Sequence, residues 1–393
     1  MNRRTFILSV GCEAARAIGQ GFAFELACFG ATHVHSGTDL VGATVGVAAM
    51  TAGHGRLFAQ ESSVLAGKRR YSVDGISCIF QPDSAIFLRD EKPILAYRTT
   101  FCEKGGQDKT SNSTSQTPQV PFPCFTRLSS PTSLLPLSPI RKSAAAAFVC
   151  GNVNGVNYTV KNSKKNDLPC GQIRSNGLKW KGMSEIGSDG VLTRLLSWNL
   201  GVQGVFDDEC KWINPEGRVQ MTDTRRFRVA FYDKSRYGIY VTIDWHAVDD
   251  VVITANQNCL FGVQASAPLA PASGGMMMNS NGVCGASEIY GRRANWVACW
   301  GRLQAASPTA APDDIPDLQE GVALMSHPSN PWGVSPWNTT PFGYMSPTYI
   351  PFLSKPWLVR AGEGVRLRYL ILAFTGDPDD GEVDEIYRSY ISS

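Results

Sequence analysis

The chain has 393 residues, enough for a sizeable hydrophobic core, and Lys plus Arg total 37 against 34 for Asp plus Glu. With a net charge of only +3 and no run of like charges, the sequence shows no sign of a nucleic-acid partner. Gly (38) and Pro (23) are plentiful, which favours many short strands joined by turns. The 11 cysteines are scattered without metal-ligand spacing, so we expect no metal site, and the sequence contains no Walker loop and no G-x-G-x-x-G motif, so we expect no cofactor.

Residues 1–60 are predicted to form a twin-arginine (Tat-type) export signal. Arg3 and Arg4 precede the apolar Phe6–Leu8, and Leu57–Gln60 offers a small-residue cleavage site. The apolar run Leu40–Ala52 is shorter than the roughly 20 residues that cross a bilayer as a helix. We therefore expect a periplasmic or extracellular protein with no membrane span in the mature chain.

Residues 61–101 are predicted to supply the first strands of the main domain, because Tyr71–Phe80, Ala85–Leu88 and Ile94–Arg98 are short β-favouring runs separated by turn residues. From residue 102 to 143 the composition shifts to Ser, Thr, Pro, Gln and Leu without any period. This stretch is predicted to be irregular or disordered.

Residues 144–393 are predicted to form an all-β, antiparallel β-sandwich domain. In Arg226–Phe231 and in Val365–Ile371 apolar and polar residues alternate with a period of two, which places one set on a core face. Similar short runs recur with turn residues between them. Only residues 383–390 read as a helix, because Val383, Ile386 and Tyr390 fall on one helical face.

The segment around His327 is the first candidate for chemistry. An apolar strand ends at His327-Pro328 and is followed by Asn330-Pro331, and each proline holds the residue before it extended. His327 is therefore predicted to lie in reach of solvent near the open end of the sandwich, as a general acid or base or as a ligand for a substrate hydroxyl. The alternative is a histidine that caps a turn by bonding the backbone.

A second segment places Glu288, Arg292, Arg293, Trp296 and Trp300 within one hairpin-sized stretch. Aromatic faces stack on sugar rings, while carboxylates and guanidinium groups bond hydroxyls. The alternative is a tryptophan-rich core with charges at its edge. A paired-carboxylate glycosidase needs two acids about 5–10 Å apart, and Glu288 and Asp244 are the candidates in this sequence.

The segment that begins at Gly151 reads as a turn, with Asn and Gly at positions tolerant of positive φ. Asn152 and Asn154 are candidates to present amides to a polyol, and a purely structural turn is the alternative.

Together these segments resemble the bacterial family known as methane oxygenase PmoA, from about Gly151 to Ile391. The resemblance rests on Asn152–Tyr158, which is similar to that family's D-V-N-G-x-x-F-W, on Glu288–Trp296, and on Ser326–Pro331 with Trp337 following. It implies a secreted β-sandwich, of the supersandwich type seen in sugar mutarotases. It also implies, through the family's label, an oxygenase with metal ligands.

Two features of the sequence depart from what this resemblance implies. Outside residues 1–60 only His246 and His327 remain, which is a poor set for copper or iron. The family's histidine-rich D-H-x-H-H-x-G stretch is replaced here by Arg141–Phe148, which contains no histidine. We hypothesise that a local frameshift replaced the native residues within 102–150.

The leading functional hypothesis is an exported protein that binds or processes a carbohydrate or another small polyol. The catalytic candidates are His327 and Glu288. The predicted substrate-binding residues are Asn154, Arg292, Trp296, Asn330 and Trp337. A non-catalytic binding or structural module is the alternative, the metal-dependent oxygenase is a third reading, and whether the chain is an enzyme stays open.

Overall fold

The structure is a computed structural model, and it describes residues 60–65, 68–73, 75–99, 122–139, 144–159, 168–185, 201–257, 259–303 and 318–392. The chain divides into two units, Met1–Gly55 and Arg56–Ser393, and every described residue belongs to the second. Apart from Gln60, the predicted signal region lies outside the described residues. No helix in the described part of the chain is long and apolar enough to span a membrane.

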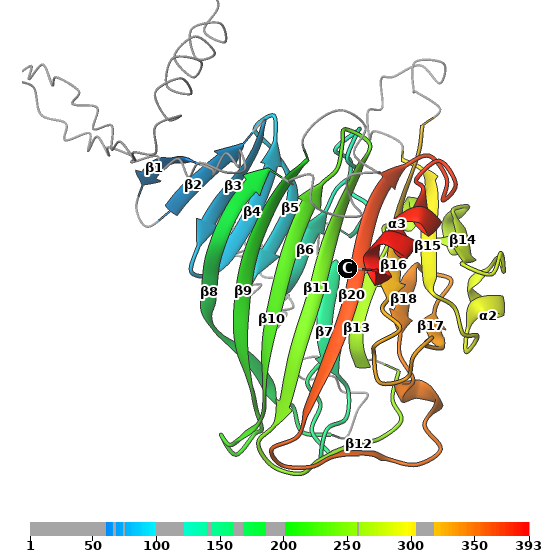
Figure 1. Cartoon of the computed structure of the whole chain (residues 1–393). Helices are drawn as coiled ribbons and strands as arrows, with labels where there is room; N and C mark the ends of the chain where they lie inside the picture. The colour runs from blue at the N-terminus through cyan, green and yellow to red at the C-terminus, as the bar shows by residue number, and fades with distance from the viewer. Residues whose placement is uncertain are drawn as a thin grey trace, which may run out of the picture. The chain divides into compact units, whose positions relative to one another are not determined.

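The described residues form antiparallel strands with a few short helices (Figure 1). The strands are β1 (Gln60–Leu65), β2 (Lys68–Val73), β3 (Ile76–Gln81), β4 (Ser84–Arg89), β5 (Lys92–Arg98), β6 (Cys124–Leu128), β7 (Ala146–Cys150), β8 (Gln172–Glu185), β9 (Val202–Ile213), β10 (Val219–Phe231), β11 (Arg236–Ala247), β12 (Val251–Ile253), β13 (Cys259–Gln264), β14 (Met276–Asn279), β15 (Trp296–Arg302), β16 (Gln319–Ser326), β17 (Trp337–Thr339), β18 (Tyr344–Pro347), β19 (Trp357–Val359) and β20 (Gly364–Thr375). The helices are α2 (Ala286–Ile289), α3 (Val383–Ile391) and the 3₁₀ turns η2 (Ala267–Leu269), η3 (Pro271–Ser273) and η5 (Ile350–Phe352).

Two large sheets make an all-β sandwich. One is ten-stranded, in the order β1-β2-β3-β4-β5-β6-β7-β13-β18-β17, and the other is eight-stranded, in the order β14-β15-β16-β20-β11-β10-β9-β8. Strands β12 and β19 form a separate two-stranded sheet at one end. Strands β1 to β7 run as a meander in which each strand pairs antiparallel with the next, so neighbours in sequence are neighbours in the sheet.

Aromatic side chains from the two sheets pack against each other to form the core. Tyr97 of β5 and Phe125 of β6 contact Phe227 of β10, with ring centroids 4.7 and 5.2 Å apart. Phe148 of β7 meets Trp212 of β9 in the same way, at 5.5 Å. Burying each such ring contributes roughly 1.5–3 kcal/mol, so these contacts hold the two layers together.

The predicted alternation in β10 and β20 is confirmed. Phe227 and Val229 are fully buried between the sheets, whereas Arg226, just before Phe227 in sequence, is exposed and Arg228, between the two, is half-buried. In β20 the residues Leu367 and Tyr369 are buried. One face of each strand therefore points inward and the other outward, as a period of two requires.

The predicted C-terminal helix is confirmed as α3, and it covers part of the outward face of the eight-stranded sheet. Its residues Val383, Ile386, Tyr387 and Tyr390 are buried in a second apolar cluster, separate from the core between the sheets. Figure 1 shows α3 lying across β16 and β20. This helix therefore shields some of the outward side chains of the sheet from solvent and leaves the others exposed.

The stretch that composition predicts to be irregular contains an ordered strand. Strand β6 lies inside residues 102–143, pairs with β5 and β7, and buries Cys124, Phe125 and Leu128. For Cys124–Leu128 the prediction of irregular structure is therefore wrong. The strand is only five residues long, and composition averaged over some forty residues hides so short an apolar run.

Candidate functional site

The motif segments of the sequence meet at one end of the sandwich, near the two-stranded sheet of β12 and β19. Asn154 contacts β12, because its Nδ2 donates to the carbonyl of Asp250 (2.9 Å) and its Oδ1 accepts from the backbone N–H of Val252 (2.7 Å). The residues after α2 form isolated β-bridges to the segment before and within β17, Tyr290 with Trp337 and Arg293 with Pro336. Residues far apart in sequence thus gather at this end.

His327 does not lie in reach of solvent, so that prediction is wrong. Its side chain is only 6% exposed and its ring packs edge-on against Tyr390 of α3, with centroids 5.2 Å apart. Nδ1 accepts the backbone N–H of Ser329 (3.0 Å), so the proton of the neutral ring is on Nε2, which has no hydrogen-bond partner among the described residues. Burial lowers the pKa of His327, and the nearby Arg368 guanidinium lowers it further.

Three other predicted binding residues are buried with their polar atoms already bonded. Trp296 donates from Nε1 to Oδ1 of Asp384 in α3 (2.7 Å), and Trp337 donates to the carbonyl of Ala294 (2.9 Å). Asn330 donates to the Arg368 carbonyl (3.0 Å) and accepts from the Arg368 backbone N–H (2.7 Å). All three are less than 5% exposed, so they stabilise the fold and present no surface to a ligand.

Glu288 and Arg292 are the two predicted site residues that do lie together in solvent. They form an ion pair of 3.2 Å with both side chains more than half exposed. Asn154 is also exposed, but backbone groups use both ends of its amide. Its φ of 51° confirms the positive-φ turn that the sequence predicts.

Half-buried aromatic rings beside this ion pair form a surface that we call the aromatic rim, made of Tyr290, Trp332, Tyr349, Phe352 and Trp357. The rings of Trp332 and Tyr349 are nearly parallel, 17° apart with centroids at 6.4 Å. Trp332 also meets Trp357 of β19 edge-on at 5.0 Å, and Tyr290 meets Phe352 at 5.2 Å. Tyr290 is 41% exposed and the other rings are partly exposed, so the rim is an accessible apolar surface.

Arg293 lies against the aromatic rim in a fixed position. Its Nη1 donates to the carbonyls of Trp332 (3.3 Å) and Val334 (2.5 Å), and its guanidinium lies 5.8 Å from the centroid of the Tyr349 ring. Arg293 remains exposed to solvent beside these rings. A few fixed polar groups beside aromatic surface are the usual composition of a small-molecule binding site.

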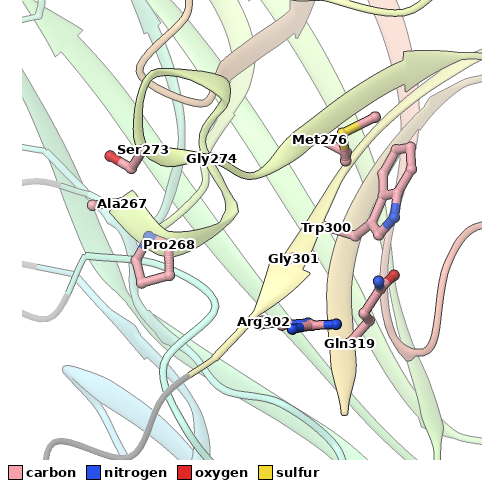
Figure 2. A pocket seen from close by; sticks show the side chains of 9 residues that line it. All are labelled: Ala267, Pro268, Ser273, Gly274, Met276, Trp300, Gly301, Arg302 and Gln319. Carbon is pink, nitrogen blue, oxygen red and sulfur yellow. The ribbon is translucent and has the colours of Figure 1, made fainter. Parts of the chain in front are cut away.

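Two open pockets lie elsewhere on the eight-stranded sheet. One, of about 490 Å³, is lined in part by Met276, Trp300 and Gln319, and Figure 2 shows the Trp300 ring beside Met276 with Arg302 and Gln319 below it. Trp300 is only 8% exposed, so this pocket offers little aromatic surface. The other, of about 500 Å³, lies between α3 and the β14–β15 hairpin and is lined in part by acidic side chains of residues 379–385.

Within the described ranges, no three His, Cys, Asp or Glu side chains lie close enough together to hold a metal ion. His246 lies near the end of β11 and is exposed. His327 directly follows β16 and is buried. The residues that the structure describes therefore do not fit the metal centre that an oxygenase would need.

A buried charged network inside the core was not predicted from the sequence. Arg225 is 1% exposed and pairs with Asp223, with Nε to Oδ1 at 2.7 Å. Asp208 accepts from Tyr97 (2.6 Å) and Ser175, and burial raises the pKa of Asp208 although Arg225 lowers it in part. Because the members of this network are buried between the sheets, we infer that the network stabilises the fold and does not contact a ligand.

The aromatic rim was also missed from the sequence. Trp332, Tyr349 and Trp357 are separated by the short strands β17 and β18, by turns and by a 3₁₀ helix, so no single strand or helix period relates them. The signal that was present is the density of aromatic and proline residues from 328 to 357. A short span rich in both indicates aromatic side chains held on irregular backbone, where binding residues concentrate.

Comparisons with known proteins identify a family without a known activity. A family of unknown function, DUF6807, matches residues 145–388, which is more than half of the chain. No curated protein matches it. A solved structure titled "Crystal Structure Analysis of HI1317" is similar over 82% of this chain and 100% of that chain, at 8% identity and a TM-score of 0.21, a likeness too weak to carry an argument.

Proposed function

The chain belongs to the family of unknown function DUF6807, so its own geometry has to supply a function, and we propose that it binds carbohydrate at the aromatic rim. The observation that supports this most strongly is the set of partly exposed rings at the end of the sandwich, in which Trp332 contacts both Tyr349 and Trp357. Neither the resemblance to the PmoA family nor the predicted export enters this proposal.

The rim suits a sugar ring because it combines flat apolar surface with fixed donors. The C–H groups of a pyranose pack on an aromatic face, and the hydroxyls around the ring need hydrogen-bond partners. Arg293 supplies donors next to the Tyr349 ring, and the Glu288–Arg292 pair supplies both an acceptor and donors close to Tyr290. Aromatic rings lose little conformational entropy on binding, because they have few rotatable bonds and these rings already contact one another.

We propose binding without turnover. A glycosidase of the usual kind needs two carboxyl groups about 5–10 Å apart on either side of the scissile bond. At the rim, Glu288 is in solvent and paired with Arg292, and His327 is buried beneath α3. Hydrolysis of a bound glycan by the purified protein would show that this part of the proposal is wrong.

A glycan array followed by calorimetry on the best ligand tests the proposal. Tyr349→Ala and Trp332→Ala should each weaken binding about tenfold, because losing one stacked ring costs on the order of 1.4 kcal/mol. The matched control is Phe342→Ala, which removes an aromatic side chain that is 73% exposed in the β17–β18 turn. Thermal unfolding of each variant shows whether it is folded.

The expected pattern is a loss of affinity in both rim variants with the control unchanged. Wild-type protein that binds no glycan, or folded rim variants that bind as well as Phe342→Ala does, would contradict the proposal.

A further inference from the structure

The outward face of the eight-stranded sheet is a second surface, distinct from the aromatic rim. The register of β10 places Arg226 opposite Asp207 of β9 and Thr242 of β11, and Thr242 is in turn opposite Arg368 of β20. Residues two apart along each strand share this face. Figure 1 shows β8, β9, β10 and β11 side by side next to α3, with no helix drawn over them on the side that α3 occupies.

Basic side chains outnumber acidic ones on this surface, which we call the cationic face. The acidic members are Asp207, Glu209 and Asp244. The basic members are Arg174, Lys179, Lys181, Lys211, Arg226, Arg228, Arg366 and Arg368. The surplus is five positive charges, eight against three, whereas the whole chain has a surplus of only three. The positive charge of the protein is therefore concentrated here.

The acidic members of the cationic face already have basic partners. Asp207 pairs with Lys181 (3.4 Å) and Arg226 (3.3 Å). Glu209 pairs with Lys179 (2.5 Å), and Asp244 pairs with Arg366 (2.5 Å). The remaining basic groups therefore have no carboxylate of this face to neutralise them.

Arg228 and Arg368 are the clearest cases, and both border α3. The Arg228 guanidinium lies over the Tyr240 ring, 3.7 Å from its centroid, and the same ring meets Tyr390 of α3 at 5.8 Å. Arg368 is half-buried close to His327 and Tyr390. Neither guanidinium forms an ion pair within the described residues. Both sit on strands packed on one side by the core, so their positions are set by the sheet.

We propose that the cationic face binds the acid groups of an acidic polysaccharide, with Arg228 and Arg368 as its principal contacts. Arginine binds carboxylate and sulfate groups through two parallel N–H bonds, and a partly desolvated guanidinium without a partner gains more from such a bond than a fully hydrated one. The basic groups of the cationic face are spread over several strands. Charge complementarity therefore favours an anionic polymer with repeated charges.

The choice of a saccharide among polyanions rests on the proposed function. Strands β11 and β20 run from the cationic face to the end where β12 and β19 lie, and Asn330, two residues before the rim residue Trp332, donates to the carbonyl of Arg368 (3.0 Å) and accepts from its backbone N–H (2.7 Å). A polymer whose sugar rings lie on the rim can therefore extend along the sheet to place its acid groups on Arg368 and Arg228. The choice of an anion does not depend on the rim.

The test compares dextran sulfate with unmodified dextran, which has the same sugar backbone without charge, at low and at high salt. The variant Arg228→Gln/Arg368→Gln removes both principal contacts, and Arg228→Lys/Arg368→Lys keeps their charge without the paired N–H geometry. The control Arg218→Gln/Lys234→Gln removes two exposed charges from the turns that flank β10. Thermal unfolding confirms that each variant is folded.

We expect wild-type protein to bind dextran sulfate with an affinity that falls as salt rises. The Gln variant should bind about tenfold more weakly, the Lys variant should retain part of the affinity, and the control should match wild type. No binding of dextran sulfate, or equal losses in the Gln variant and the control, would overturn the inference. A single-stranded DNA oligomer that binds as tightly as dextran sulfate would overturn the assignment to a saccharide.

Measuring both glycan binding and dextran sulfate binding, on the rim variant Tyr349→Ala and on the arginine variants, separates this inference from the proposed function. An empty glycan array together with dextran sulfate binding that depends on Arg228 and Arg368 would end the proposed function and leave the anion-binding face supported. Glycan binding at the rim, together with dextran sulfate binding that does not depend on the two arginines, would support the proposed function and end the anion-binding inference.

Discussion

Replacing His327 with Ala is expected to destabilise the protein without removing a ligand contact. The ring is 6% exposed, accepts the Ser329 backbone N–H at 3.0 Å and the Ser329 hydroxyl lies 2.7 Å from the same nitrogen. Losing these bonds costs about 1–2 kcal/mol, and losing the edge-on contact with Tyr390 costs about 1 kcal/mol more. Removing the unpartnered Nε2–H returns roughly 1 kcal/mol, so the net loss is about 1–2 kcal/mol.

The companion variant His327→Phe isolates the contribution of ring packing. Phenylalanine keeps a ring against Tyr390 and removes the buried Nε2–H, so it should lie within about 1 kcal/mol of wild type. Urea denaturation followed by tryptophan fluorescence measures both variants, and glycan binding is measured on the same samples.

The pH dependence of stability provides a second test of the role of His327. Because the pKa of His327 is lowered in the folded protein, first by burial and then by Arg368, the unfolded chain binds the proton more readily. The contribution of His327 is therefore fully present above its ordinary pKa of 6.5 and is lost as the pH falls toward the lowered value. Wild type should lose stability below pH 6.5 more steeply than His327→Phe does. An unchanged unfolding midpoint for His327→Ala, combined with a large loss of glycan affinity, would refute this account of the residue.

The remaining predictions concern the fold around the two proposed surfaces. Asn154→Ala should cost about 1–2 kcal/mol in chemical denaturation, and Asn154→Gly less, because glycine tolerates the φ of 51° while losing the same two backbone bonds. Arg225→Met should lower the free energy of unfolding by about 3–5 kcal/mol, since it leaves Asp223 buried without its counter-charge; a loss under 1 kcal/mol would show that the network is dispensable. Trp296→Phe removes the bond to Asp384 and should raise amide exchange in α3 while exchange in β10 stays slow, whereas equal exchange in both would mean that the bond does not hold the helix.

The sandwich was predictable from sequence because its signal is local. The inward residues of β10 and β20 repeat every second position, and that period alone places Phe227, Val229 and Leu367 in the core. The C-terminal helix was predictable for the same reason, since Val383, Ile386 and Tyr390 repeat at helical spacing.

The candidate site was largely not predictable, because exposure depends on contacts between distant segments. His327 follows an apolar strand and precedes a proline, which locally indicates an accessible residue, but α3 covers it from more than fifty residues further along the chain. Trp296 shares a strand face with Trp300, and the same helix covers that face. The rim arises from loops whose rings meet only in the folded protein.

The most direct test of carbohydrate binding at the aromatic rim is an NMR titration that follows the indole N–H signals of the tryptophans. With the saccharide selected on the array, the signals of Trp332 and Trp357 should shift, and those of the buried Trp212 and Trp337 should stay in place. Shifts confined to Trp296 and Trp300, or no shift in any indole at saturating saccharide, would contradict the assignment of the binding surface to the rim.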